Sequence, residues 1–273
     1  PLRTWPGRKK TTRLDHDDRD RRAGDLRSRL TSAAAVLTHT HQRHAGLAQV
    51  GHGMMGPMRH TSATRATRRP TDRALRVGLT GGIGAGKSTV AALLEEHGAA
   101  VTSADEVSRD VVSPGSAGLA AVVAEFGEDI LASDGSLDRS ALGRVVFSDD
   151  LRRARLEEIL LPLIAAEAWA RMETVPAGQV AVYDVPLLVE GQMQDLFDLV
   201  VVVEADLELR LERLAERGMG REEALARIAS QATDEERRVV ADVVLSNSGS
   251  TDELRRDVDR LWNARIIGAG AFS

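Results

Sequence analysis

The strongest chemical signal in the chain is a phosphate-binding pattern between residues 81 and 88. The stretch reads GGIGAGKS and fits G-x-x-x-x-G-K-[ST]. Glycines let backbone N–H groups turn toward phosphate oxygens, and the helix that follows adds the positive end of its dipole. The lysine reaches the β- and γ-phosphates, and the serine hydroxyl ligates Mg²⁺. The pattern predicts a nucleoside triphosphate site with contacts from Gly82, Ile83, Gly84, Ala85, Gly86, Lys87, Ser88 and Thr89. A glycine-rich turn that binds nothing is the alternative, and a strand and helix on either side disfavour it.

Lysine usage narrows the class of nucleotide-binding protein. The chain has three lysines, at positions 9, 10 and 87, among many arginines. Lys87 is therefore the one lysine of the folded region that begins near residue 75. A guanine-reading N-K-x-D motif needs a further lysine, so a Ras-like GTPase is disfavoured.

Two carboxylates follow predicted strands and are candidates for catalysis and metal binding. Asp105 comes just after the apolar run 99–102, where an acid could orient or deprotonate an acceptor hydroxyl. Its alternative role is to cap the helix that starts there. Asp184 ends the apolar run 179–183, a position that suits a magnesium ligand together with Ser88. The alternative for Asp184 is a strand-end turn before Pro186.

Arginines on the charged helices expected at 206–217 and 221–231 are further candidates. A mobile helical lid could carry one of them onto the transferred phosphoryl group and exclude water. Gly218 and Gly220 would serve as its hinge. Arg217 is the first choice for phosphate contact and Arg227 the second. The alternative is pairing of Glu and Arg on solvated helix faces, worth a few tenths of a kcal/mol per pair. The arginines considered are Arg210, Arg213, Arg217, Arg221 and Arg227.

Strands and helices must alternate to position these residues. Short apolar runs at 76–80, 99–102, 179–183, 199–203 and 239–245 predict strands, separated by helical patterns, of which the longest covers 150–173. Such alternation favours a parallel sheet covered on both faces. The chain from 75 to 273 is thus predicted to be a three-layer α/β domain. Its core would comprise 75–104, 178–205 and 239–266, with a helical insertion at 105–174 and a lid at 206–233.

Residues 1–74 differ in composition from the rest. They carry 16 Lys or Arg against 6 Asp and show no helical or strand period, which predicts disorder. A start that lies outside the natural protein, an inert tail and a basic arm all remain open for this segment. The chain has no cysteine, 3% aromatic residues and no apolar run of about 18 residues. We expect a cytoplasmic protein without nucleic-acid or membrane partners.

Several motifs together resemble the dephospho-coenzyme A kinase family. The phosphate loop alone is generic, but Asp184-Val185-Pro186-Leu187-Leu188-Val189-Glu190 is similar to the family signature D-[IV]-P-L-L-[FY]-E. Shorter matches continue in order from about 76 to 265, among them Ser103-Ala104-Asp105, Arg227-Ile228-Ala229-Ser230-Gln231 and Asn247-Ser248-Gly249. Two positions depart from the pattern. Leu161 stands where histidine is frequent, and Val189 stands where an aromatic residue is usual.

The resemblance implies a P-loop kinase fold in which the helical region 105–174 binds the substrate. It also implies phosphorylation of the ribose 3′-hydroxyl of dephospho-coenzyme A, with ATP as the phosphoryl donor. On the matching positions it makes Asp105 the base, and Lys87 and a lid arginine the charge stabilisers. Asn247 and Gly249 become neighbours of the adenine. No obligate protein partner is expected. Another small-metabolite P-loop kinase, of nucleoside, shikimate or gluconate type, and a non-catalytic nucleotide-binding regulator are the alternatives.

Overall fold

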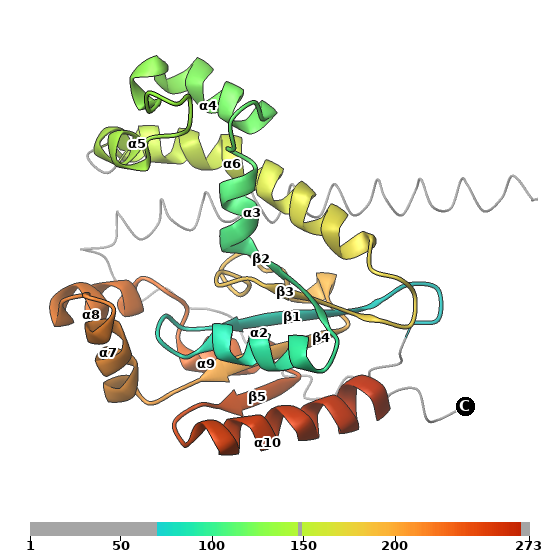
Figure 1. Ribbon diagram of the computed structural model, residues 1–273. Helices are drawn as coiled ribbons and strands as arrows, with labels where there is room; N and C mark the ends of the chain where they lie inside the picture. Colours follow the sequence, from blue (N-terminus) through green and yellow to red (C-terminus); the bar gives the residue numbers. More distant parts are fainter. Residues whose placement is uncertain (1–69, 147–148, 269–273) are drawn as a thin grey trace, which may run out of the picture.

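The computed structural model describes residues 70–146 and 149–268 (Figure 1). A five-stranded sheet forms the centre, with the strand order β2-β3-β1-β4-β5 and every neighbouring pair parallel. The strands are β1 (Leu75–Gly81), β2 (Ala100–Ser103), β3 (Val180–Asp184), β4 (Leu199–Glu204) and β5 (Val243–Ser246). The predicted α/β class with a parallel sheet is confirmed.

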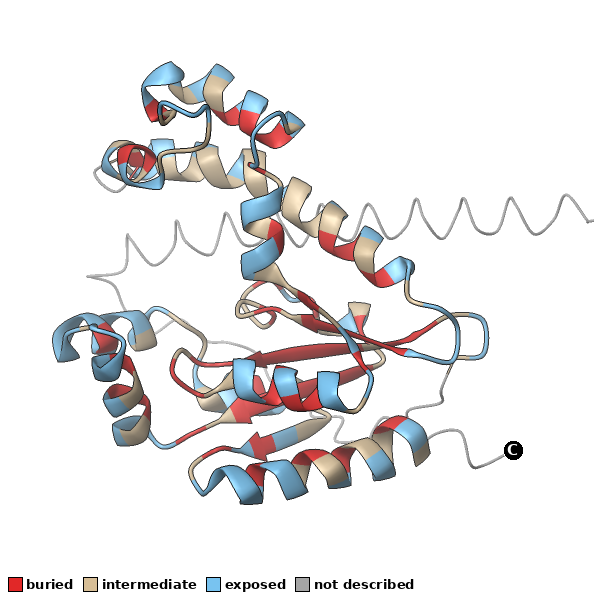
Figure 2. Cartoon of the chain, in the orientation of Figure 1, coloured by how far each residue is buried: buried red, intermediate tan, exposed pale blue. Residues whose placement is uncertain are grey.

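Helices cover both faces of the sheet. One face packs against α2 (Lys87–Glu96), α10 (Thr251–Leu261) and the π-helical segment η3 (Trp262–Ile267). The other packs against α3 (Ala104–Asp110), α6 (Asp150–Glu173) and α9 (Asp234–Val240). The central strands are therefore buried on both sides, as Figure 2 shows. Since burial of one large aliphatic side chain is worth about 1.5–3 kcal/mol, these strands hold the three layers together.

A helical region stands away from the sheet at the N-terminal end of α6 (Figure 1). It comprises α4 (Ala117–Phe126), η1 (Glu128–Ile130) and α5 (Arg139–Val146). A separate core, which includes Leu119, Val122 and Leu142, joins these helices to α6. The C-terminal end of α6 packs on the sheet through Trp169 and Met172. One 24-residue helix thus connects the two cores over about 36 Å.

Two further helices lie next to the loop between β1 and α2. They are α7 (Leu207–Glu216) and α8 (Arg221–Ala229), the segment predicted as a lid. Leu211, Leu214 and Ala224 form a small core between them, and Ile83 of the loop packs against it. The lid segment therefore contacts the phosphate loop in this structure.

The strand predicted from Val239 begins four residues later, at Val243. Val239 and Val240 instead end α9, a helix that the sequence analysis did not predict. The cause is a capping box in which Thr233 and Glu236 satisfy each other's backbone N–H groups. This local start signal outweighs the β preference of two valines.

The predicted disorder of the basic segment falls mostly on residues 1–69, outside the described part of the chain. Arg73 lies within the described part and donates two hydrogen bonds to Asp198, at 2.6 and 2.7 Å. Across 70–146 and 149–268, none of the helices combines the length and apolar character needed to cross a membrane.

Candidate functional site

The phosphate loop leaves β1 at the middle of the sheet and turns directly into α2. Gly86 is the N-cap of α2 and has a φ of 96°, a conformation that favours glycine. A Cβ atom at Gly86 would also collide with Nδ2 of Asn247. That amide nitrogen donates a hydrogen bond of 2.8 Å to the carbonyl of Ala85. The loop is thus shaped by a contact with the turn that follows β5.

Lys87 is the first residue of α2, and its ammonium folds back over the loop. Its Nζ donates to the carbonyl oxygen of Gly81 at 3.2 Å. Burial lowers the pKa of Lys87 below its ordinary value, while the negative charges of Asp184 and Asp105 act in the opposite direction. The structure therefore brings the lysine and both predicted carboxylates into one electrostatic cluster.

Asp184 ends β3 beside the central strand, where its register partner is Leu79. Burial raises the pKa of this carboxyl; the charge of Asp105 adds to the rise, and Lys87 opposes it. Its Oδ1 is buried, and no described residue offers it a hydrogen bond. A buried carboxylate oxygen without a partner fits a cation ligand. Ser88, in the first turn of α2, is exposed and offers a hydroxyl.

The described residues contain no cluster of three or more His, Asp or Glu side chains that could hold a metal. A site with few protein ligands is typical of Mg²⁺ on a nucleotide, where phosphate oxygens and water complete the shell. The hydroxyl of Ser88 and the carboxylate of Asp184 are oxygen groups of the kind that such a magnesium site uses.

Asp105 is the second residue of α3 and is exposed. The N-cap position of α3 belongs to Ser103, so Asp105 is not the capping residue. Ser103 pairs with Asp184 in the register of β2 and β3, which sets the start of α3 beside the end of β3. An exposed carboxylate near Lys87 is accessible to an acceptor molecule.

Two of the five candidate arginines contact the phosphate loop. Arg210 is buried, and its Nε donates to the carbonyl of Ile83 at 2.9 Å. Its Nη2 lies where a Cβ on Gly82 would stand, so this glycine permits the close approach. Arg213 donates to the carbonyl of Asn247 at 2.9 Å and, over longer distances, to the carbonyls of Gly84 and Ala85.

The other candidate arginines point to solvent. Arg217 is exposed at the C-terminal end of α7. Arg227 is exposed and donates to Glu223 at 2.8 Å, and Arg221 pairs with Glu208 across α7 and α8. Phosphate contacts by Arg217 and Arg227 stay predictions and require the lid to move.

Arg237 is a residue near the site that the sequence analysis missed. It lies on α9 and is 1% exposed. Its positive charge, like that of Arg210, contributes to the lowered pKa of Lys87. The capping box from Thr233 to Glu236 was the available signal for α9, but no motif marks the arginine itself.

Further contacts join the end of α8 to the loop and to β3. The side chain of Gln231 accepts a hydrogen bond from the backbone N–H of Ile83 at 2.8 Å. Glu190, which follows β3, accepts one from the N–H of Ala232 at 2.8 Å. Asn247 is buried against the loop, whereas Gly249 lies exposed in the turn before α10. The adenine contacts proposed for Asn247 and Gly249 stay predictions.

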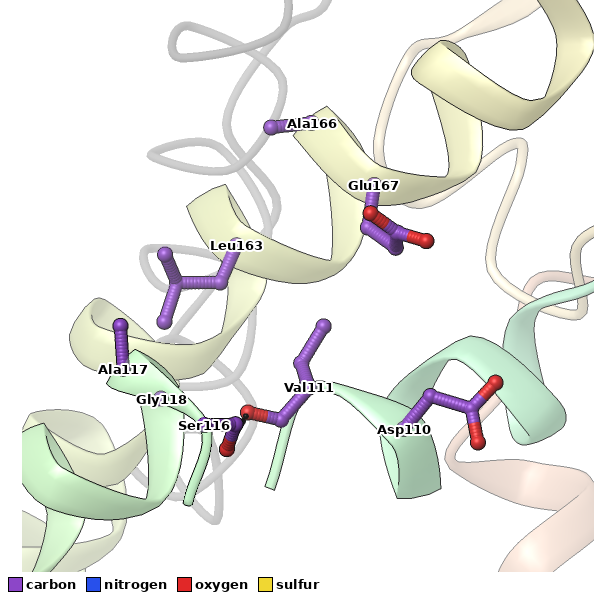
Figure 3. Close-up of a pocket in the computed structure, with 8 residues that line it drawn as sticks. All are labelled: Asp110, Val111, Ser116, Ala117, Gly118, Leu163, Ala166 and Glu167. Carbon is purple, nitrogen blue, oxygen red and sulfur yellow. Dashed lines mark hydrogen bonds between the residues drawn. The ribbon is translucent and has the colours of Figure 1, made fainter. Parts of the chain in front are cut away.

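A hollow lies between α3, α4 and α6, in the helical region (Figure 3). Leu163, Ala166 and Glu167 come from α6, opposite residues of α3, α4 and the link between them. Arg171 donates hydrogen bonds of 2.8 Å to both Asp110 and Glu167, so one arginine neutralises the acids at this hollow. The lining residues are Asp110, Val111, Ser116, Ala117, Gly118, Leu163, Ala166 and Glu167.

The profile of a family described as dephospho-CoA kinase matches residues 75–253, which contain every site residue above. This chain belongs to the dephospho-CoA kinase family. The chain is therefore a kinase of coenzyme A biosynthesis, and the family uses ATP as its phosphoryl donor. The two alternative classes are not supported.

Relatives named dephospho-CoA kinase resemble this chain along most of its described length. That of Frankia casuarinae is 54% identical over 186 residues, which is 68% of this chain and 81% of the relative. That of Streptomyces avermitilis is 51% identical, covering 69% of this chain and 92% of the relative. The Mycolicibacterium paratuberculosis relative is 53% identical over 71% of this chain, but this chain spans about half of it, 48%.

Two solved structures share the fold. A protein from Thermus thermophilus is 34% identical, with a TM-score of 0.60 over 71% of this chain and 98% of that one. Dephospho-CoA kinase from Campylobacter jejuni is 25% identical, with a TM-score of 0.55 and the same coverage. Of the two departures from the family pattern, Val189 packs against the core under β3, as expected for an apolar wall. Leu161 is half-buried in α6.

Proposed function

We propose that this chain transfers the γ-phosphoryl group of ATP to the ribose 3′-hydroxyl of dephospho-CoA, giving coenzyme A and ADP. The observation that carries the proposal is the cluster of Lys87, Asp105 and Asp184 at the carboxyl ends of the strands. Ligands of open parallel sheets bind at this edge.

ATP binding uses the phosphate loop and its supports. Backbone N–H groups at the start of α2 bind the phosphates, and the ammonium of Lys87 moves from the Gly81 carbonyl to the β- and γ-phosphate oxygens. Asn247 and Gly249 lie on the adenine side. Arg213 supports both the loop and the Asn247 turn by its hydrogen bonds to their carbonyls.

Ser88 and Asp184 would hold Mg²⁺. Bound magnesium supplies positive charge to the phosphates during transfer. The buried, unpaired Oδ1 of Asp184 supports this assignment within the described structure.

Asp105 accepts the proton of the 3′-hydroxyl as the ribose oxygen bonds to the γ-phosphorus. The bond between that phosphorus and the β–γ bridging oxygen breaks at the same time, and ADP leaves with the electron pair. Phosphoryl transfer has a loose transition state, so positioning and charge stabilisation carry most of the catalysis. Lys87 and Arg210 supply positive charge from the loop side. Arg217, and after it Arg227, would add charge if α7 and α8 close further over the phosphates.

The hollow beside α3 is a suitable site for the part of the acceptor that does not react. Asp105 and Asp110 lie five residues apart on α3, a rise of about 7.5 Å. An acceptor whose hydroxyl reaches Asp105 can thus extend along α3 toward Leu163 and Ala166. The apolar part of the lining suits an uncharged arm of the substrate.

Release of ADP with dephospho-CoA as acceptor, measured by a coupled assay, tests the proposal. Adenosine and shikimate serve as competing acceptors, and ³¹P NMR of the product locates the new phosphate. Of the three acceptors, we expect only dephospho-CoA to be turned over with ATP. The product should carry a phosphomonoester at the 3′ position of the ribose. Preferential turnover of another acceptor would contradict the assigned substrate.

A cytoplasmic site of action, supported by the requirement for ATP, remains a prediction.

A further inference from the structure

Buried polar atoms without partners are concentrated around Lys87. In the described part of the chain, seven buried side-chain nitrogen or oxygen atoms lack a hydrogen bond. Five of them belong to Asp184, Glu190, Arg210 and Arg237, all of which surround the phosphate loop or the link from α8 to α9. Such atoms are rare in folded proteins unless a ligand or a mechanism uses them.

Arg237 is the most deeply buried charge in this group. Its Nη1 donates to Oδ1 of Asp234 at 3.1 Å, and its Nη2 lies 3.9 Å from Oε1 of Glu190. Its Nε and Nη2 have no hydrogen-bond acceptor among the described residues. A buried guanidinium stays charged and is destabilising unless it is well paired. The pairing of Arg237 is therefore incomplete for a purely structural ion pair.

Asp234 is shared between two arginines. Its Oδ2 lies 3.6 Å from Nη1 of Arg210, while its Oδ1 accepts from Arg237. Arg210 in turn donates to Ile83, and its own Nη2 is buried against Gly82 without a partner in the described structure. A continuous contact thus runs from α9 through Asp234 and Arg210 to the phosphate loop.

We propose that Arg237 is a positioning residue for phosphoryl transfer. It holds Asp234 away from full pairing with Arg210, and so leaves the Nη2 of Arg210 available to a phosphate oxygen. The inference rests on the kinase function proposed above. Without Arg237, the carboxylate of Asp234 is free to move onto Arg210, which it would partly neutralise and draw away from Gly82. Charge stabilisation at the transferred phosphoryl group would then fall.

The test is a double-mutant cycle between Arg237 and Asp234. Arg237→Met keeps most of the side-chain volume and removes the charge. We expect kcat to fall about 10²-fold, with a smaller change in KM for ATP, because Asp234 would then partly neutralise Arg210, whose charge acts mainly at the transition state. Adding Asp234→Asn to Arg237→Met should restore kcat by about tenfold, because it removes the carboxylate that would pair with Arg210.

Arg238→Met is the matched control. Arg238 is the next residue of α9, is exposed and pairs with the largely buried Glu204 rather than with Asp234 or Arg210, so its loss should leave kcat unchanged. Thermal unfolding without nucleotide separates stability from catalysis. If Arg237→Met does not fold, Arg237→Leu removes the same charge and likewise leaves Asp234 without a donor at this position. A merely structural role predicts a lower Tm with kcat unaffected in the folded fraction.

The inference is overturned if the folded Arg237 variant keeps kcat within about threefold of the parent, or if Asp234→Asn adds to the loss in that variant. These results require that the unaltered chain phosphorylates dephospho-CoA in the same assay. Absence of that turnover would instead contradict the proposed function.

Discussion

Asp184→Asn is expected to make the nucleotide-free protein more stable while making the enzyme much slower. Burial raises the pKa of Asp184, the charge of Asp105 adds to this, and Lys87 compensates only in part. The folded protein therefore binds this proton more tightly than the unfolded chain does, so ionisation of Asp184 lowers the free energy of unfolding. Asparagine has no charge to desolvate and avoids this cost.

The sign of the effect depends on pH. Below the ordinary aspartate pKa of 3.8, both folded and unfolded chains are protonated at residue 184, and the cost is absent. As pH rises above that value the unfolded chain loses its proton first, so the cost grows until pH passes the raised pKa of the folded state. The stability advantage of Asp184→Asn should therefore appear as pH rises and then stay constant.

The expected size follows from the unpaired Oδ1. A buried polar atom without a partner costs about 1–3 kcal/mol. Asparagine also leaves a polar atom at this place. We therefore expect the gain in the free energy of unfolding to lie at the lower end of this range, about 1 kcal/mol. For a domain of this size that corresponds to a rise in Tm of about 2–4 °C. Turnover should fall by at least about 10²-fold, because the substitution removes a ligand and a charge from the phosphoryl site.

Circular dichroism during heating, between pH 4 and 8 without nucleotide or metal, measures the stability, and coupled ADP release measures turnover. Asp198→Asn is the matched control of opposite sign. Burial raises the pKa of Asp198, but hydrogen bonds from Arg73 and from the N–H of Arg76 lower it by more. The pKa of Asp198 therefore lies below its ordinary value. Asp198 thus stabilises the fold above that value, and the stabilisation is lost as pH falls. A lower Tm for Asp184→Asn at pH 7 would refute the reasoning, because it would mean that Lys87 or another group compensates the carboxylate fully.

Lys87→Ala should reduce turnover about 10³-fold or more, and near-normal turnover would exclude Lys87 from the site. Asp105→Asn should lower kcat about 10²–10⁴-fold with little change in ATP affinity; a loss of stability alone would indicate a structural role. Arg213→Ala should weaken ATP binding, measured in a nucleotide titration. Arg217→Ala should lower kcat more than it raises KM. If the Arg217 substitution leaves kcat unaffected, Arg217 has no part in the lid mechanism. Ala166→Trp, at the exposed rim of the α3–α6 hollow, should raise KM for dephospho-CoA about tenfold, equivalent to about 1.4 kcal/mol, and leave KM for ATP unchanged. An unchanged KM for dephospho-CoA would place the acceptor elsewhere.

The sequence alone predicted the parts of this protein that depend on local patterns. The phosphate loop is contiguous and its residue types follow from phosphate chemistry, so it could be identified without a structure. Short apolar runs alternating with helical patterns predicted the parallel sheet. Because the carboxyl ends of parallel strands share one edge, residues that follow two strands, Asp105 and Asp184, could be placed beside Lys87 before any coordinates were known.

Only the tertiary structure decided which arginines lie at the loop. Arg210, Arg213 and Arg217 are spaced by three and four residues, so they share one face of α7 and the sequence pattern treats them alike. The position of α7 beside the loop brings the first two into contact with it and leaves Arg217 exposed. Arg237 was missed for a related reason. Its helix is short, and its neighbours Val239 and Val240 resemble a strand. Its place near the site arises from the packing of α9 beside Glu190 and Lys87, which lie far from it in the sequence. Contacts of this kind depend on the distance between elements, and that distance is set by the packed core as a whole.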